Sequence, residues 1–359
     1  MANVRIGIIG CGGIANGKHM PSLAKVKEAQ IVAFCDIVLE RAEQAKEKYG
    51  TSESVVYSDY QELLKDETID VIHVCTPNDS HAEISIAALE AGKHVLCEKP
   101  MAKTAADARL MLEAAKRTGK KLSIGYNNRF RADSRYLKEV CSQDELGEIY
   151  FAKAHAIRRR AVPTWGVFLD EEKQGGGPLI DIGTHALDLV LWMMDNYKPK
   201  VVLGRAYHKL SQTENAANAW GPWDPAQFTV EDSAFAMITM ENGASIVLES
   251  SWAINSLEVD EAKVTLCGTK AGADMKKGLR INGEENSRLY VKDIELNSGG
   301  VAFYDGASED PAELEARAWI DAVLNDKDPV VLPEQALVVS EILEAIYESS
   351  RTGKAIYFE

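Results

Sequence analysis

The chain has 359 residues, too many for one ordinary hydrophobic core and enough for two domains. Hydrophobic residues make up 46% and charged residues 26%, the mixture typical of a folded globular protein. The formal net charge is -15, so the surface repels nucleic acids and anionic lipids. These numbers argue against a nucleic-acid-binding or membrane-surface protein.

The location of the protein is also constrained by its sequence. The apolar start, 4–9, runs directly into glycines without the basic segment or cleavage site of a secretory signal. No apolar run approaches the roughly 18–20 residues that span a bilayer. The six cysteines are scattered and form no C-x-x-C pair, which favours buried thiols in a reducing compartment. We therefore expect a cytoplasmic protein.

The first part of the chain alternates short β-branched runs with helical patterns. Strands are predicted at 4–9, 30–35, 55–57, 71–75, 94–97 and 122–125. Helices are predicted between them, from the glycine turn to about residue 26 and then at 39–49, 60–64, 82–91 and 104–118. This alternation predicts a doubly wound parallel sheet of the Rossmann type over residues 1–125.

The pattern changes near Tyr126. A strong helical stretch at 182–194 is followed by longer strands with no helices between them, at 201–210, 233–240, 245–252, 262–267 and 288–296. Asn242-Gly243 between two of these is a strong hairpin signal. Residues 126–359 are expected to form an α+β domain with a large, mostly antiparallel open sheet. Two helices, 311–324 and 334–349, end the chain, and the last could pack back on the first domain.

A glycine-rich turn separates the first predicted strand from the first helix. It reads Gly10-Cys11-Gly12-Gly13-Ile14-Ala15 and fits the G-x-G-x-x-A pattern. Gly10 allows the tight turn, Gly12 lets the backbone approach a pyrophosphate, and Ala15 lets helix and strand pack closely. We expect Gly10, Gly12, Gly13, Ile14 and Ala15 to bind a dinucleotide at the helix N-terminus.

Asp36 ends the second predicted strand, where a carboxylate binds the adenine-ribose hydroxyls in such folds. A carboxylate at this place repels the 2′-phosphate of NADP, and Ile37 rather than a basic residue follows it. Arg41, about one turn away, could soften this preference. NAD is therefore the expected cofactor and NADP the less favoured one. The alternative is a structural turn with a helix-capping aspartate.

Two motifs follow buried strands at the expected carboxyl edge of the sheet. Thr76-Pro77-Asn78, with His81 at the start of the next helix, is placed where ligands bind in such folds. Alternatively, His81 is a helix-terminal residue without a chemical role. Glu98-Lys99-Pro100 follows the next strand. Lys99 can hydrogen-bond a substrate hydroxyl and stabilise negative charge on its oxygen, and Pro100 can restrict the backbone through a cis bond. The alternative is a solvated lysine before a turn proline.

A glycine run at 175–177 precedes the strong helix of the second part. Asp181 and His185 are four residues apart and share one helical face, with Gly183 keeping the surface between them open. A carboxylate and an imidazole can bind a hydroxyl and take its proton as a hydride leaves. A purely structural Asp–His pair and a metal site remain alternatives, although no third metal ligand is evident.

Taken together, these features resemble the Gfo/Idh/MocA oxidoreductase family, whose namesakes are glucose-fructose oxidoreductase and inositol dehydrogenase. The matching elements lie in the family's order and cover essentially the whole chain. They are the glycine turn, Asp36, Thr76-Pro77-Asn78 with His81, Glu98-Lys99-Pro100, the glycines 175–177 with Asp181-x-Gly183-x-His185, and the ending Ser349-Ser350-Arg351-Thr352-Gly353-Lys354.

The resemblance implies a catalytic lysine at Lys99, with the family's Asp and His at Asp181 and His185. It also implies homodimers or homotetramers that assemble through the open sheet face. Arg129, Arg158 and Trp165 are further substrate-binding candidates, because an arginine and an aromatic plane suit a polyol. A solvated basic stretch with one packing tryptophan is the competing interpretation.

The leading hypothesis is reversible hydride transfer between NAD and a secondary alcohol of a sugar, sugar derivative or cyclitol. His185 would be the general base, Lys99 would polarise the reacting oxygen, and Asp181 would hold a neighbouring hydroxyl. No metal is expected. Two alternatives are NAD-assisted cleavage of a glycoside without net redox, and a non-enzymatic sensor that binds NAD and a sugar.

Overall fold

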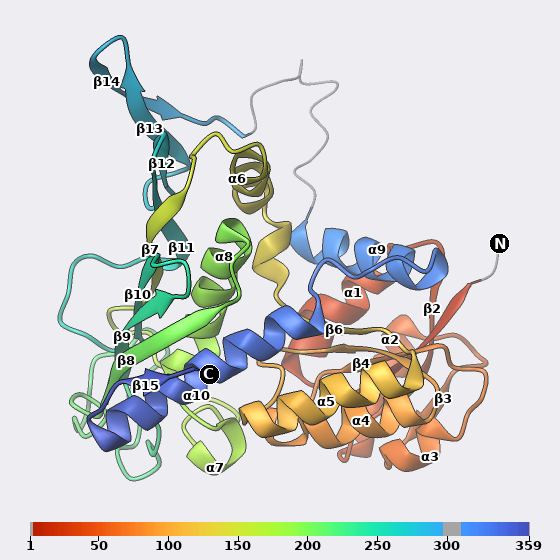
Figure 1. The fold of residues 1–359 in the computed structure, drawn as a ribbon. Coiled ribbons are helices and arrows are strands. Elements are labelled where there is room, and N and C mark those ends of the chain that lie inside the picture. The colour runs from red at the N-terminus through yellow and green to blue at the C-terminus, as the bar shows by residue number, and fades with distance from the viewer. Residues whose placement is uncertain (1–2, 297–309, 359) are drawn as a thin grey trace. The chain divides into compact units, whose positions relative to one another are not determined.

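The computed structural model describes residues 3–296 and 310–358. The chain divides into two compact units (Figure 1). One comprises Met1–Phe130 and Glu309–Leu337, and the other comprises Arg131–Ser308 and Val338–Glu359. This division differs from the expected one, because a segment far along the chain joins the first unit.

The first unit is built on a six-stranded parallel sheet with the order β3-β2-β1-β4-β5-β6. This order is that of a doubly wound dinucleotide-binding fold, so the predicted fold class is confirmed. Its strands are β1 Val4–Ile9, β2 Ala29–Cys35, β3 Val55–Tyr57, β4 Val71–Val74, β5 His94–Cys97 and β6 Leu122–Ile124. Its helices are η1 Ala15–His19, α1 Met20–Leu23, α2 Leu39–Tyr49, α3 Tyr60–Leu64, η2 Asn78–Ser80, α4 His81–Glu90, α5 Ala105–Thr118, η3 Asn127–Phe130 and α9 Pro311–Leu324.

Helix α9 belongs to this first unit because it completes the unit's hydrophobic core. Its residues Ala316, Trp319 and Ile320 are buried in one cluster with side chains of β1 and β2. The helix packs beside α1, while α4 and α5 lie side by side (Figure 1). Helical periodicity predicts that α9 exists, but it does not say which distant core the helix covers.

The second unit is built on a nine-stranded sheet with the order β14-β13-β12-β11-β7-β10-β9-β8-β15. Its neighbouring strands are antiparallel except for β7 and β10, so the predicted open, mostly antiparallel sheet is confirmed. The strands are β7 Ile149–Ile157, β8 Pro199–Tyr207, β9 Ser233–Met240, β10 Ser245–Ser251, β11 Glu261–Gly268, β12 Ala271–Asp274, β13 Arg280–Glu285, β14 Arg288–Asp293 and β15 Ile356–Tyr357. The helices are α6 Ala132–Ser142, α7 Glu171–Gln174, η4 Leu179–Gly183, α8 Thr184–Met194 and α10 Pro333–Thr352, whose first residues count with the first unit.

Helix α8 covers one face of this sheet, against β7, β10 and β11. Most of its side chains are buried, and most of these are apolar, which suits a helix packed on a sheet. The turn before it, η4, is wound as a π-helix, and η1 in the first unit is wound in the same way. Both π-helical turns therefore lie in segments that the sequence marks as functional.

Candidate active site

The glycine turn of the first unit leaves open space where a phosphate could approach. Gly10 has a φ of +90°, and a Cβ atom there would lie 2.6 Å from the Cys75 carbonyl oxygen. A Cβ atom at Gly12 or Gly13 would meet nothing within 4 Å. Ala15 is fully buried at the start of η1. The turn therefore fits the dinucleotide site that the sequence predicts, with backbone N–H groups at a helix start.

Asp36, at the end of β2, is fixed against this turn. Its Oδ2 accepts a hydrogen bond of 2.8 Å from the Cys11 backbone N–H, and its Oδ1 accepts one of 2.9 Å from the Val38 N–H. The carboxylate is buried, whereas Ile37 beside it is 93% exposed. Asp36 thus presents a preoriented carboxylate next to the glycine turn, and no basic side chain follows it directly.

His81 connects the two loops at the carboxyl ends of β4 and β5. Its ring nitrogens lie 2.8 Å from the Pro100 carbonyl oxygen and 2.9 Å from the Thr76 carbonyl oxygen. The ring is fully buried, and this burial lowers the pKa of His81 although the two carbonyl groups oppose the shift. These contacts support a positioning role for His81. Pro77 and Asn78, in the loop between, are exposed and partly exposed respectively.

Glu98 stands at the centre of a buried polar network that the sequence did not predict. Its Oε1 lies 2.8 Å from Lys18 Nζ and 2.7 Å from His19 Nε2, and its Oε2 accepts from the Lys99 N–H at 3.2 Å. His19 in turn lies 2.9 Å from His73, nitrogen to nitrogen. Burial alone would raise the pKa of Glu98, but Lys18 and His19 hold it well below its ordinary value. Glu98 is therefore a buried anion beneath the Lys99 backbone.

Lys99 follows β5 and is partly buried. The Lys99–Pro100 peptide bond is cis, as the sequence suggests. Because Glu98 accepts from the Lys99 N–H and His81 contacts the Pro100 carbonyl, the backbone around Lys99 is held from both sides. The predicted cofactor and lysine motifs are thus brought together within this one unit.

In the second unit, the glycine run 175–177 packs tightly against its surroundings. A Cβ atom at Gly176 would lie 2.0 Å from the Tyr347 hydroxyl oxygen, and one at Gly177 would lie 2.3 Å from the Glu231 carbonyl oxygen. A Cβ atom at Gly183 would lie 3.0 Å from Ser250 Oγ. Gly183 therefore permits close packing on β10, and the expectation that it keeps a surface open is wrong.

Glu231 holds the start of η4 in place, and its role was missed because it lies far along the chain. Its carboxylate accepts hydrogen bonds from the Gly177 N–H at 2.8 Å, the Leu179 N–H at 3.0 Å and the Tyr347 hydroxyl at 2.9 Å. Burial raises the pKa of Glu231 to about 7, against these three donors. A sequence indicates a capping acid when the acid directly precedes the helix, and Glu231 does not.

Asp181 lies in the π-helical turn η4, and His185 lies in the first turn of α8. Asp181 Oδ2 accepts a hydrogen bond of 3.1 Å from the indole N–H of Trp252 and lies 3.8 Å from Arg158 Nη1. Both Asp181 and His185 are partly exposed within the unit. Trp252, a fully buried residue, was not predicted as part of this cluster.

The three predicted substrate-binding residues have different surroundings. The Arg129 side chain is buried, and its Nη1 donates to the Val330 carbonyl at 3.0 Å and to Gln335 at 2.7 Å. Because these contacts within the first unit hold the buried Arg129 guanidinium, we do not assign Arg129 to substrate binding. Arg158 lies beside Asp181, and Trp165 is 52% exposed in the same unit.

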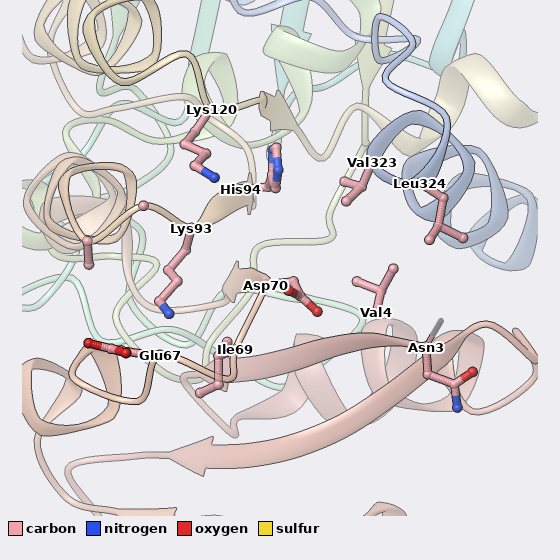
Figure 2. A pocket seen from close by; sticks show the side chains of 12 residues that line it. Asn3, Val4, Glu67, Ile69, Asp70, Lys93, His94, Lys120, Val323 and Leu324 are labelled. Carbon is pink, nitrogen blue, oxygen red and sulfur yellow. The ribbon is translucent and has the colours of Figure 1, made fainter. Parts of the chain in front are cut away.

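A cavity in the first unit lies away from these motifs. Figure 2 shows it lined by Val4 at the start of β1, Asp70 before β4, His94 at the start of β5, and Val323 of α9. These positions mark the amino ends of the parallel strands. Because ligands of such sheets bind at the carboxyl ends, we do not assign the cofactor to this cavity.

Two absences hold for the described residues, 3–296 and 310–358. No group of three or more His, Cys, Asp or Glu residues among them could hold a metal ion. No helix in this part of the chain combines the length and hydropathy needed to cross a membrane.

The fold and the site define the class of protein: an NAD-binding oxidoreductase with a Rossmann unit and an open-sheet unit. The family model "Oxidoreductase family, NAD-binding Rossmann fold" matches residues 4–126. The model "Oxidoreductase family, C-terminal alpha/beta domain" matches residues 138–358. The chain belongs to the Gfo/Idh/MocA family, which confirms the resemblance seen in its motifs.

Two of the similar proteins are named as dehydrogenases of a glucoside and of inositol. The chain is 37% identical to D-glucoside 3-dehydrogenase of Escherichia coli K12 over 98% of this chain and 97% of that protein. It is 32% identical to inositol 2-dehydrogenase of Salmonella typhimurium LT2 over 54% of this chain and 56% of that protein.

Solved structures share the fold. An oxidoreductase domain protein from Kribbella flavida superposes with a TM-score of 0.85 at 24% identity over 100% of both chains. Levoglucosan dehydrogenase in complex with NADH and levoglucosan gives 0.84 at 20% identity over 99% of both chains.

Proposed function

We propose that this protein transfers a hydride between NAD and a secondary alcohol of a sugar, and that its substrates are glucosides oxidised at position 3. The observation that carries this proposal is the 37% identity to D-glucoside 3-dehydrogenase over nearly the whole of both chains, together with Lys99, Asp181 and His185 in the expected motifs. Cyclitols and free aldoses are the alternative substrates, and the test compares them with glucosides.

The residues of the first unit suit NAD. The open glycine turn would hold the pyrophosphate and Asp36 the adenine ribose, as their geometry permits. When bound, the nicotinamide supplies the hydride acceptor or donor. The choice of NAD over NADP is part of this proposal and rests on the buried carboxylate of Asp36 and the apolar Ile37 beside it.

Each of three side chains has a distinct proposed task. Lys99 would donate a hydrogen bond to the reacting oxygen and stabilise negative charge on it. His185 would take the hydroxyl proton during oxidation. Asp181, already oriented by Trp252, would accept a hydrogen bond from a neighbouring hydroxyl.

The proposal is tested by following reduced nicotinamide absorbance with NAD or NADP and a panel of glucosides, free aldoses and inositols. Turnover with NAD and glucosides is the expected result. Lys99→Ala and His185→Ala should each lower kcat by about 100-fold or more, the scale of a lost general acid or base. Unchanged turnover in both variants would refute the roles, and a preference for inositols would refute the substrate class.

We also propose a cytoplasmic homo-oligomer. The six cysteines are free thiols, as expected in a reducing compartment. The sheet face of the second unit exposes apolar side chains on adjacent strands, where Leu203 of β8 pairs with Met237 of β9, and Met237 with Val247 of β10. Such a patch is typical of a subunit interface.

A further inference from the structure

We propose that Trp165 and Trp220 form a second sugar subsite, which binds the non-reacting ring of a disaccharide substrate. This inference rests on the proposed function, because it assumes that the reacting ring is held beside Asp181. It narrows the substrate from glucosides in general to those in which a second pyranose ring is the substituent.

The first observation is that two large aromatic rings are exposed side by side. Trp165 is 52% exposed and Trp220 is 46% exposed, although they are separated by more than fifty residues in sequence. Their ring centroids lie 4.9 Å apart at an interplanar angle of 84°. Burying an indole is strongly favourable, and an exposed indole does not gain that free energy. Two neighbouring exposed indoles therefore indicate a surface that another molecule covers.

The second observation is that the segments that carry the two rings are held against each other by hydrogen bonds. The Trp220 loop is docked on the Trp165 segment by two hydrogen bonds between Asn218 and Val162, of 2.8 and 2.9 Å. The Thr164 hydroxyl donates to the Trp220 carbonyl at 2.9 Å. A preformed aromatic surface binds a ring without the entropic cost of ordering loops.

The third observation is that the aromatic surface has a polar rim. The Arg158 guanidinium lies 5.7 Å from the Trp220 ring centroid and makes two hydrogen bonds of 2.6 Å to Glu261. Arg160 donates to Asn255 at 2.7 Å. A pyranose ring has an apolar C–H face surrounded by hydroxyl groups. It therefore matches an aromatic face with charged neighbours better than a purely apolar group does.

The fourth observation connects this surface to Asp181 within the second unit. Arg158 reaches both, because its Nη1 lies 3.8 Å from Asp181 Oδ2 while its guanidinium carbon faces Trp220. A second route of packed rings runs from Trp165 through Phe168 to Trp252, whose indole N–H donates to Asp181. The Arg158 side chain thus connects Asp181, which would hold the reacting ring, with the tryptophan pair.

The test compares two substrates in the same variants. Glucose, or methyl glucoside if glucose is not turned over, occupies only the first position, whereas a panel of 1,1-, 1,2-, 1,4- and 1,6-linked glucose disaccharides reaches the second. Trp165→Ala and Trp220→Ala should each lower kcat/KM for the best disaccharide by about tenfold, which corresponds to about 1.4 kcal/mol of lost contact with an aromatic ring. In Trp220→Ala, kcat/KM for the small substrate should change by less than about twofold. Trp220→Phe should restore most of the disaccharide activity.

A matched control is Tyr136→Ala, which removes an exposed aromatic side chain of α6 in the same unit and should change neither substrate. Equal losses on both substrates, or no loss on the disaccharide, would overturn the subsite. Sedimentation velocity adds another readout: if Trp220→Ala dissociates an oligomer, the rings serve an interface and the subsite is rejected.

Calorimetric titration with the same disaccharides separates this inference from the proposed function. If the wild-type protein oxidises no sugar but binds a disaccharide more tightly than Trp220→Ala does, the subsite stands and the proposed function fails. If the wild-type protein turns over glucosides and binds disaccharides no better than the variant does, the subsite fails and the proposed function stands. If it binds no disaccharide, the subsite fails in either case.

Discussion

The Asp36 carboxylate holds the neighbouring backbone in place, and in the proposed function it also selects the cofactor. Its two oxygens accept hydrogen bonds from the Cys11 and Val38 N–H groups. The carboxylate ends β2, the position that binds the adenine ribose in dinucleotide-binding folds. The 2′-phosphate of NADP would lie close to this negative charge. The repulsion between the two would weaken the binding of NADP relative to NAD.

Asp36→Asn removes the charge but keeps the side-chain shape. We expect the ratio of kcat/KM for NADP to that for NAD to rise by about tenfold or more, because tenfold corresponds to only about 1.4 kcal/mol. Steady-state kinetics with both cofactors measures this. Ile37→Arg alone is the control, since it leaves the carboxylate in place and should shift the ratio less. An unchanged ratio in Asp36→Asn would mean that the carboxylate does not select the cofactor.

Glu231 gives the second unit a pH-dependent stability. Its pKa is raised to about 7 by burial, from an ordinary 4.5. Between these values the folded protein holds a proton that the unfolded chain has released. The stabilisation from this proton is therefore complete below about pH 4.5 and is lost as the pH rises through 7, by an amount on the order of 3 kcal/mol.

Glu231→Gln cannot titrate, so the Tm of this variant should fall less between pH 5 and pH 8 than the Tm of the wild-type protein. Thermal unfolding followed by circular dichroism across this range measures the difference. Glu241→Gln, on an exposed turn, corrects for the loss of one negative charge. Parallel curves for the wild-type protein and Glu231→Gln would show that Glu231 stays ionised in the fold.

At the scale of elements, two ion pairs join α9 to the start of the chain, and they differ in burial. Lys18 of η1 lies 2.8 Å from Glu315 of α9 and 2.8 Å from Glu98, and all three side chains are buried. Lys25, just after α1, pairs with Glu313 of the same helix, but the lysine is exposed. The structure therefore offers a buried pair and an exposed pair between the same parts of the fold.

Lys18→Met should destabilise the protein by about 3–5 kcal/mol, because it leaves Glu98 and Glu315 as buried charges without their cation. Lys25→Ala, the matched control, should have little effect, since exposed pairs contribute little. Urea unfolding followed by tryptophan fluorescence measures both. Adding Glu315→Gln to Lys18→Met should recover part of the loss, and equal effects of the two lysine variants would contradict the argument.

Helices and strands were predictable where a glycine and a regular hydrophobic pattern mark their ends. The helix Leu39–Tyr49 and the strand Val4–Ile9 match their predicted ends, because glycines follow both and their patterns are regular. Strand β7 was missed, since it alternates small alanines with lysine and histidine rather than β-branched residues. Motif residues were predictable because chemistry requires them, whereas Glu231, Trp220 and Lys18 act through contacts that only the folded chain creates.

At the scale of the whole molecule, the exposed sheet face of the second unit predicts self-association. Met237→Glu combined with Leu203→Glu places two charges at the centre of the apolar face, where burying them in an interface would be costly. We expect the double variant to sediment as a monomer at concentrations where the wild-type protein sediments as a dimer or tetramer. Leu110→Glu, on α5 of the first unit, is the control and should leave the assembly intact. A wild-type monomer would refute the proposal.

The π-helical turns at Ala15–His19 and Leu179–Gly183 have a consequence for how the sequence can change. A π-turn holds one residue more than an α-turn, so each behaves as an insertion accommodated inside a helix. Deleting one residue from Leu179–Gly183 would let the helix rewind as a regular α-helix. A deletion between Asp181 and His185 would also reduce the spacing of these two residues from four to three, and so change the angle between them about the helix axis. A change of length in either segment would therefore alter the placement of the side chains that it carries.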